Sequence, residues 1–219
     1  MIREELKEVD LGLLSKSDGS SRLYFRSSLV TVSVQGPAES RQQIDLANEA
    51  ILSVHFCPRK VQPSSPTENV CVASIKKILE SVIARSLFPR AIICIAIHEG
   101  VAGSCFLSTI FNACFLALLD AGIAMLHSFV ALTIAIPNEI SSNKDPIISP
   151  NKEQEFEAES VFVFVIEMPT KRELFCHAWG NFSPQHYQQC LQLALGEADK
   201  ILLFYRGEYS KKLANLKFN

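Results

Sequence analysis

The chain has 219 residues, of which 48% are hydrophobic and 20% are charged, and its formal net charge at pH 7 is −2. This is the composition of a globular protein, which excludes a disordered chain. The small negative charge also excludes a broadly cationic nucleic-acid binder, so any contact with nucleic acid must use local basic patches. The chain starts with a charged segment, and its longest apolar stretch, near 105–119, is interrupted by polar residues. We therefore expect a soluble protein with no membrane partner.

Cysteine and histidine residues give no sign of a metal site. The seven cysteines form no CxxC pair, and several lie in apolar runs, where a thiol behaves as a small hydrophobic group. Cys176 and His177, taken with His186 and Cys190, do not match the spacing of a zinc site. We predict no metal ligand, and the odd number of cysteines favours reduced thiols in an intracellular compartment.

The first part of the chain is rich in β-branched and aromatic residues, which is typical of strands. After an Asp-Gly-Ser turn signal, the segment 22–37 predicts a hairpin or meander that Gly36-Pro37 should end. The segment 49–58 predicts a further strand, and 59–68 is a loop by composition.

The spacing of the apolar residues then changes from that of a strand to that of a helix. From Thr67, apolar side chains recur at a spacing of about 3.6 residues, which predicts an amphipathic helix that Phe88-Pro89 should end. The run 91–100 is almost wholly apolar, as in a strand that is covered on both faces. The longer segment 106–125 is also almost wholly apolar and predicts a buried helix.

The last part of the chain predicts three strands, which cover residues 129–137, 160–168 and 173–179. The last two should form a hairpin around Pro169-Thr170-Lys171-Arg172. A final helix should begin at Ser183-Pro184, a serine N-cap followed by a proline at the first helical position, and end at Gly207. No linker or internal repeat divides the chain. The order of the elements predicts an α/β fold, a mixed sheet with packed helices, in a single domain over residues 1–219.

Candidate functional residues come from charge rather than from a catalytic motif. The sequence carries no GxSxG motif, phosphate-binding loop or dinucleotide-binding glycine pattern. Two basic pairs are candidates for contact with nucleic acid, Arg59-Lys60 and Lys76-Lys77, although a solvated face has the same appearance in a sequence. Of the two, Arg59-Lys60 is the stronger candidate because it opens a predicted loop that could reach a phosphate backbone.

An acidic stretch between residues 147 and 159 has three possible interpretations: an active site, the remains of an active site, or a solvated face. It holds four carboxylates, those of Glu153, Glu155, Glu157 and Glu159. Paired carboxylates serve in acid–base and metal chemistry, but most acidic runs only keep a surface solvated. The residue types of the stretch do not decide between an active site and a surface.

Three stretches in order resemble the RNase PH family: DGSSRLYFRSSLVTVSVQGPAE at 18–39, LFPRAIICIAIHEG at 87–100 and LSTIFNACFLALLDAGIAM at 107–125. The resemblance continues through 145–160 and the final helix, and so covers nearly the whole chain. It implies a ribosomal-protein-S5-domain-2-like α/β fold, and it points to the eukaryotic exosome ring subunits within the family. In that branch, related subunits form a hexameric ring with a central RNA channel, capped by RNA-binding proteins of the S1/KH type.

The same resemblance implies that the acidic stretch is the remains of an active site. Active members attack the 3′ end of RNA with phosphate and carry an Asp-rich motif in this place. Ser149, Asn151 and Gln154 stand at positions that are acidic or often acidic in that motif, and only Glu155 keeps a carboxylate. Active members also bind phosphate in a glycine-rich, arginine-containing loop before the final helix, where this chain reads AWGNFSPQ. We therefore expect a lost phosphate site and no cofactor.

These observations leave two functions open. The first is a non-catalytic ring subunit of the RNA exosome in the nucleus, nucleolus and cytoplasm. It would support 3′-to-5′ RNA processing by scaffolding and by RNA binding through Arg59, Lys60, Lys76 and Lys77. The second is a free homodimer that binds RNA or DNA. It would act either as a weak nuclease with Glu155 as its catalytic residue, assisted by Mg²⁺, or as an accessory to another nuclease in DNA degradation.

Overall fold

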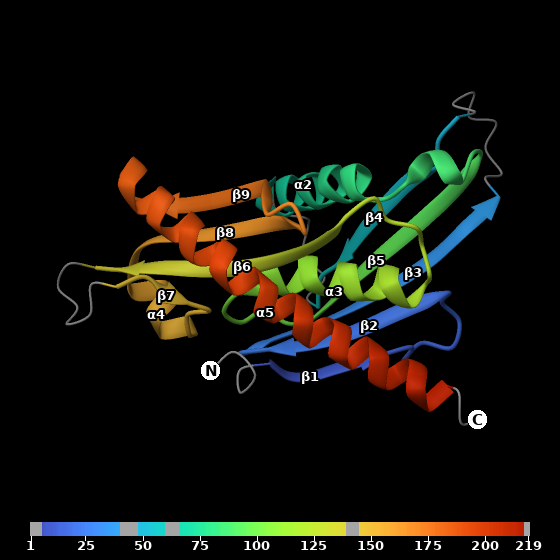
Figure 1. The fold of residues 1–219 in the computed structure, drawn as a ribbon, viewed down its shortest axis with the longest axis horizontal. Helices are drawn as coiled ribbons and strands as arrows, with labels where there is room; N and C mark the ends of the chain where they lie inside the picture. The colour runs from blue at the N-terminus through green and yellow to red at the C-terminus, as the bar shows by residue number, and fades with distance from the viewer. Residues whose placement is uncertain (1–5, 40–47, 60–65, 139–144, 217–219) are drawn as a thin grey trace.

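The computed structural model describes residues 6–39, 48–59, 66–138 and 145–216, which form two β-sheets with helices between and around them (Figure 1). The first sheet has five strands in the order β1-β2-β3-β5-β4, and the second has four in the order β7-β6-β8-β9. No helix within these ranges is long and apolar enough to span a membrane. The α/β class that the sequence predicts is confirmed.

The first sheet is mixed, as predicted, and is built by the first half of the chain. Its strands are β1 (Leu6–Leu11), β2 (Gly19–Phe25), β3 (Ser28–Glu39), β4 (Ile51–Cys57) and β5 (Ala91–Val101). Only β4 and β5 run parallel, and the other neighbours are antiparallel. Helix α2 (Pro66–Val82) lies in the connection between β4 and β5, as a parallel pair requires.

The second sheet is antiparallel and is built by the second half of the chain. Its strands are β6 (Ser128–Pro137), β7 (Ile147–Ile148), β8 (Ala158–Met168) and β9 (Arg172–Gly180). The predicted hairpin is confirmed by β8 and β9. A short helix, α4 (Lys152–Glu157), connects β7 to β8 and carries much of the acidic stretch.

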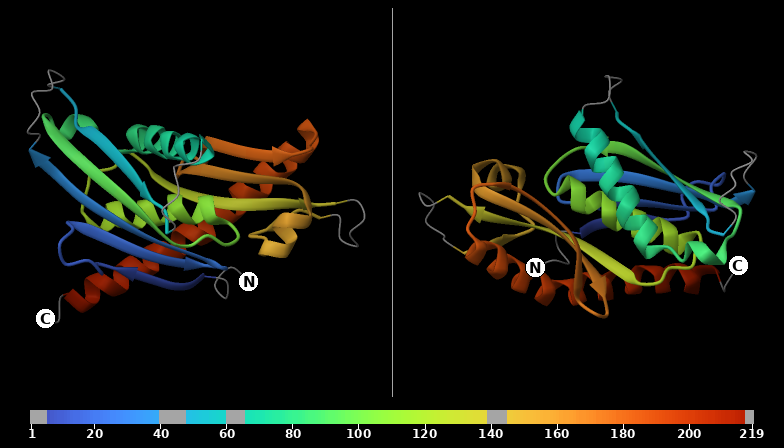
Figure 2. Two further views of the ribbon diagram at one scale, coloured as in Figure 1. Left: turned by 180° about the vertical axis from the view of Figure 1, so that it is seen from behind. Right: turned by 90° about the horizontal axis from the view of Figure 1, so that it is seen from above.

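Helix α3 (Phe106–Asp120) lies between the two sheets, as Figures 1 and 2 show. All of its residues from 108 to 118 are buried, which confirms the predicted buried helix. The side-chain amide of Asn112 donates to the carbonyl oxygen of Ala131 at 2.7 Å and accepts from its N–H at 2.8 Å. Asn112 thus satisfies both backbone groups of one residue of β6 inside the core.

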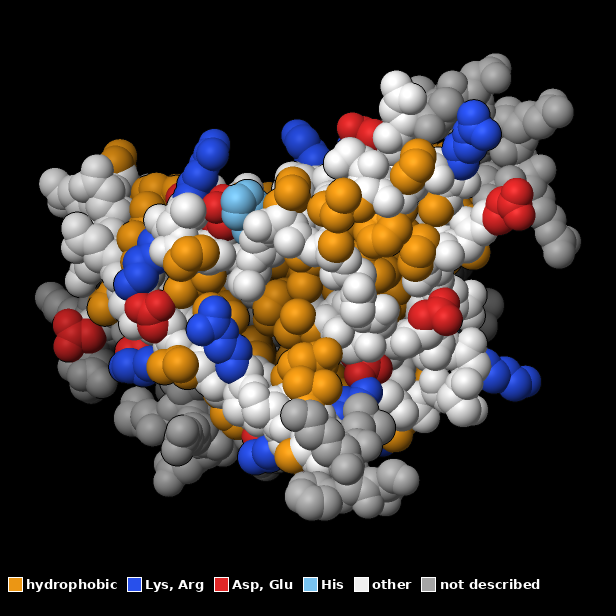
Figure 3. Space-filling model, turned by 45° about the vertical axis from the view of Figure 1, so that its right-hand side comes forward, with side chains coloured by type: hydrophobic (Ala, Val, Ile, Leu, Met, Phe, Trp, Pro, Cys, Tyr) orange, Lys and Arg blue, Asp and Glu red, His pale blue; other side chains and the backbone are white. Residues whose placement is uncertain are grey.

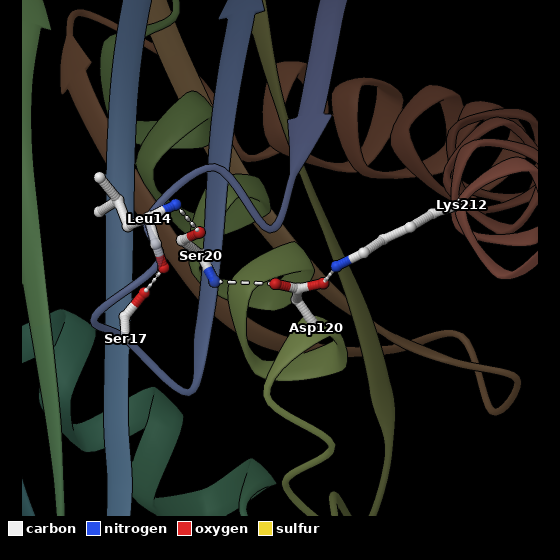
Figure 4. A network of polar contacts seen from close by, with 5 residues as sticks. All are labelled: Leu14, Ser17, Ser20, Asp120 and Lys212. Carbon is white, nitrogen blue, oxygen red and sulfur yellow. Dashed lines mark hydrogen bonds and ion pairs between the residues drawn. The ribbon is translucent and has the colours of Figure 1, made fainter. Parts of the chain in front are cut away.

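Helix α5 (Pro184–Leu216) crosses the molecule from the β8–β9 end to the β1–β2 end (Figure 1). Near its C-terminal end, Lys212 forms an ion pair with Asp120, whose other carboxylate oxygen accepts the N–H of Ser20 at 2.9 Å (Figure 4). The prediction that this helix ends at Gly207 is wrong. A glycine inside a helix costs only about 1 kcal/mol, and the contact of Lys212 holds the turns that follow.

Strand β3 also differs from the prediction, because it continues through Gly36-Pro37 to Glu39. Its pairing with β5 shifts between Gln35 and Ala38. The carboxylate of Asp18 accepts the N–H of Gly36 at 2.7 Å. A β-bulge therefore accommodates the proline, which has no N–H to donate to the sheet.

Helix α2 ends at Val82, before the predicted stop at Phe88-Pro89. The chain turns there because the next residues bond to the segment after α3. The carbonyl of Val82 accepts the N–H of Leu126 at 2.7 Å, and the N–H of Ala84 donates to Ala124 at 3.0 Å. A 3-10 helix, η1 (Arg85–Leu87), follows.

Strand β5 is fully covered on one face only, so the prediction of a strand covered on both faces is wrong. Ile93, Ile95 and Ile97 are fully buried, whereas Cys94 and Ala96 between them are half-buried and His98 is exposed. The apolar character of Cys94 and Ala96 made the run look continuous in the sequence.

Candidate functional site at the start of helix α3

Three separate segments meet at the N-terminal end of α3: the β2–β3 turn, the loop before α3, and the segment that leads into α4. Each segment holds one non-glycine residue with a left-handed backbone conformation, namely Arg26 (φ 52°), Cys105 (φ 56°) and Ser149 (φ 55°). Such conformations are uncommon for these residue types and cluster where the surrounding structure forces them. Their meeting at one place marks this end of α3 as the candidate site.

Serine side chains join the β2–β3 turn to the loop before α3. The hydroxyl of Ser27 accepts the N–H of Ser104 at 2.9 Å, and the hydroxyl of Ser28 accepts the N–H of Gly103 at 3.0 Å. A Cβ atom on Gly103 would lie 2.3 Å from the carbonyl oxygen of Ser27. The two segments therefore approach so closely that only glycine fits at position 103.

The segment before α4 is held by its own polar side chains. Ser149 is 2% exposed, and its N–H donates to the carbonyl of Thr133 at 2.8 Å. The side-chain oxygen of Gln154 accepts the N–H of Asn151 at 2.9 Å, and the side-chain oxygen of Asn151 accepts from Arg26 at 2.8 Å. The side chains of Asn151 and Gln154 thus act as capping and bridging groups.

Glu155 lies at the centre of the candidate site. One carboxylate oxygen accepts the N–H of Cys105, the N-cap residue of α3, at 3.0 Å. Burial raises the pKa of Glu155 above its ordinary value, and the hydrogen bond from Cys105 opposes this rise. The N-terminal end of a helix attracts anions because its N–H groups are unpaired and its dipole is positive there. Here the protein's own carboxylate occupies that position.

Beside Glu155, a cavity of about 650 Å³ opens towards the solvent. It is lined by Gly103, by Trp179 near the end of β9, and by residues 152, 153, 155, 156 and 157. The N–H of Asn181 donates to the carbonyl of Glu159 at 3.1 Å, which ties the segment after β9 to β8. The structure therefore brings the AWGNFSPQ segment and Glu155 to the same cavity.

The predicted nucleic-acid-binding residues do not join this site. Arg59 is exposed at the end of β4, where its guanidinium donates to the carbonyl of Gly100 at 3.3 Å. Lys60 lies outside the described residues. The Nζ atom of Lys76 lies 3.9 Å from the Oε1 atom of Glu80 on the same helix. Lys77 lines a separate cavity, together with Arg172. On the face seen in Figure 3, the coloured cationic side chains are scattered and interleaved with acidic ones.

Metal ligands are also not gathered in the described ranges. No group of three or more His, Cys, Asp or Glu side chains lies close enough to hold a metal ion in this part of the chain. Mg²⁺ usually keeps several waters and binds to proteins through one or two carboxylates together with substrate phosphates. The assistance of Glu155 by Mg²⁺ therefore stays a prediction.

Several residues of the site were not predicted from the sequence. They are Arg26, Ser27, Ser28, Gly103, Ser104 and Cys105. The sequence predicts that the segment around Arg26 and Ser27 is part of a hairpin, but its contact with a loop more than 70 residues away depends on tertiary structure. Only the glycine at position 103 offered a local signal, because glycines often mark close backbone approach.

The model of the 3′ exoribonuclease family, domain 1, known as RNase PH, matches residues 7–124. The chain therefore belongs to the RNase PH family. Among its curated relatives are two fungal proteins named exosome complex component RRP46. The Saccharomyces cerevisiae protein is 29% identical over 85% of this chain and 87% of its own length. The Schizosaccharomyces pombe protein is 27% identical over 95% of this chain and 88% of its own length.

Solved structures share the fold. The crystal structure of rice (Oryza sativa) Rrp46 superimposes with a TM-score of 0.84 and 22% identity, covering 92% of this chain and 93% of that chain. A chain of the Archaeoglobus fulgidus exosome with RNA bound to the active site has a TM-score of 0.73 and 14% identity, covering 92% of this chain and 89% of that chain. The predicted membership of the RNase PH family and the resemblance to exosome ring subunits of this type are confirmed.

Proposed function

We propose that this protein is a non-catalytic RNase PH-like subunit of an RNA exosome ring, where it completes the ring and helps to line the path of RNA. The names and coverage of its relatives support the assembly. The observation that carries the non-catalytic part is the hydrogen bond from the Cys105 N–H to the carboxylate of Glu155.

Phosphorolysis brings a phosphate anion to the anionic backbone of RNA, and active members of the family manage this charge with the acidic motif and the phosphate-binding loop. Ser149, Asn151 and Gln154 supply no acidic group at the positions that they share with that motif. Glu155 keeps its carboxylate, but this carboxylate accepts the N–H of Cys105 at 3.0 Å.

The partners that follow from this proposal are other RNase PH-like subunits as ring neighbours, cap subunits of the S1/KH type, and RNA. Arg59 and Lys77 are exposed and could each contact a phosphate group, with Lys60 and Lys76 beside them in the sequence. The nucleus, nucleolus and cytoplasm are the proposed locations. DNA binding by a free homodimer belongs to the alternative function.

The test is degradation of a single-stranded RNA labelled at its 3′ end by the purified protein, with phosphate, without phosphate, and with a chelator. Phosphorolysis releases nucleoside diphosphates, and hydrolysis releases monophosphates. We expect no product under any condition. Diphosphates that appear only with phosphate would overturn the proposal, and monophosphates lost on chelation would support the nuclease alternative.

A further inference from the structure

Two aromatic side chains stand in the solvent beside Glu155. Phe156 of α4 is 91% exposed and Trp179 of β9 is 40% exposed, and both line the same cavity of about 650 Å³. Helix α4 and the end of β9 lie at one end of the molecule (Figure 1). Burying apolar surface gains about 25 cal/mol per Å², and exposed aromatic groups that share a concave surface mark interaction sites.

The charge around these aromatic groups selects the kind of partner. The lining of the cavity holds the carboxylates of Glu153, Glu155 and Glu157 against the single ammonium of Lys152, an excess of two negative charges. Among the described residues, neither Glu153 nor Glu157 has an ion-pair partner. A nucleic-acid backbone would be repelled here, whereas a cationic side chain would be attracted.

We propose that this cavity docks a segment of a partner protein that carries both apolar and basic side chains. An apolar side chain of the segment packs between Phe156 and Trp179, and an arginine or lysine pairs with Glu153 and Glu157. An arginine can also stack on the face of Trp179, since tryptophan is the strongest cation–π partner. This inference goes beyond the proposed function, because it assigns a protein ligand to a surface that need not face RNA or a ring neighbour.

The experiment uses the fluorescence of Trp179, which is the only tryptophan of the chain. The full-length protein is titrated with short synthetic peptides that alternate arginine with leucine, glutamate with leucine, or arginine with serine. A short oligouridylate is titrated as the nucleic-acid probe. We expect a saturable change of emission with the arginine–leucine peptide, and binding weaker by about tenfold or more with the other two peptides and the oligouridylate.

Substitutions locate the binding. Phe156→Ala should weaken binding of the arginine–leucine peptide by about tenfold or more. The double substitution Glu153→Gln with Glu157→Gln should weaken binding of the same peptide and reduce the salt dependence of that binding. Leu203→Ala is the matched control, because Leu203 is 66% exposed on α5 and does not line the cavity. These side chains are exposed, so the variants should fold, which circular dichroism verifies.

The proposal is overturned by any of three results. The first is no saturable change of emission with the arginine–leucine peptide, and the second is tighter binding of the oligouridylate than of that peptide. The third is equal binding of the arginine–serine and arginine–leucine peptides, which would show that no apolar contact contributes. Equal losses in Phe156→Ala and Leu203→Ala would likewise contradict docking at this cavity.

Discussion

Glu155 caps a helix whose N-cap residue, Cys105, lies 50 residues before it in the chain: its carboxylate accepts the N–H of Cys105 at 3.0 Å. Cys105 is the N-cap residue of α3 but has a left-handed backbone, and its own side chain does not cap the helix. Serine, threonine, aspartate and asparagine usually supply that cap from the N-cap position itself. In this protein the cap comes from α4, so one contact joins the acidic stretch to the buried helix.

Removal of this cap should destabilise the protein. We expect Glu155→Ala to lower the free energy of unfolding by about 0.5–2 kcal/mol, as for other lost N-caps. Glu155→Gln keeps an oxygen that can accept the N–H of Cys105 and should cost less. Urea denaturation measures both, with Glu153→Ala on the same short helix as the control. A Glu155→Ala variant as stable as the control would contradict the capping role.

The pH dependence of stability should also report on Glu155. Because burial raises the pKa of Glu155 above its ordinary value of 4.5, the folded protein binds this proton more tightly than the unfolded chain. The stability that comes from this tighter proton binding is fully present below the pKa of Glu155 in the unfolded chain. It is lost as the pH rises through the pKa of Glu155 in the folded protein. The wild type should therefore lose stability relative to Glu155→Gln as the pH rises above the ordinary pKa of 4.5. A difference that stays constant or changes in the other direction would contradict the raised pKa.

Asn112 should be among the most sensitive positions of the core. Asn112→Ala leaves both the N–H and the carbonyl of Ala131 without their side-chain partner inside the protein. A buried backbone group without a partner costs about 1–3 kcal/mol, and this substitution affects two of them. Thermal and urea denaturation measure the loss, and Asn138→Ala at an exposed position is the control. A loss below about 1 kcal/mol would show that water or a shift of the backbone replaces the amide.

Lys212 should stabilise the fold more than its neighbour Lys211. The Asp120 side chain that Lys212 contacts is 4% exposed, whereas Lys211 pairs with Glu208 on the surface of α5. Breaking a buried ion pair costs about 3–5 kcal/mol. Because Lys212 is partly exposed, we expect Lys212→Ala to lower the free energy of unfolding by an amount near or below the lower end of that range. Lys211→Ala should cost less than about 1 kcal/mol. Equal losses in urea denaturation would contradict the anchoring of α5 by Asp120.

The sequence predicts those elements whose formation depends on local pattern. The apolar segment around α3 reads as a buried helix because nearly every residue from 106 to 119 is apolar or small. The β8–β9 hairpin is likewise predicted by its residue types and its turn. Gly36-Pro37 and Gly207 are local signals for the end of an element, but β3 and α5 continue past them. Contacts made elsewhere in the fold stabilise the continuation: Asp18 bonds to the bulge of β3, and Asp120 pairs with Lys212 of α5.

Only some residues of the candidate site can be predicted from the sequence. The resemblance to the RNase PH family singles out Glu155 as a site residue, but the sequence does not show its partner Cys105, which is 50 residues away in the chain. The left-handed conformations of Arg26, Cys105 and Ser149 cannot be predicted because these residue types prefer other regions. The proposed roles of Arg59, Lys60, Lys76 and Lys77 stay predictions, since they depend on RNA.

The most direct test of the non-catalytic role is the rate of RNA degradation by an exosome complex that is reconstituted with either the wild-type protein or Glu155→Gln. The substitution removes the carboxylate but keeps an acceptor for the N–H of Cys105, so the complex should assemble with unchanged mass. We predict equal rates of degradation for the two complexes. A rate that falls by about tenfold or more in a fully assembled Glu155→Gln complex would show that Glu155 takes part in catalysis.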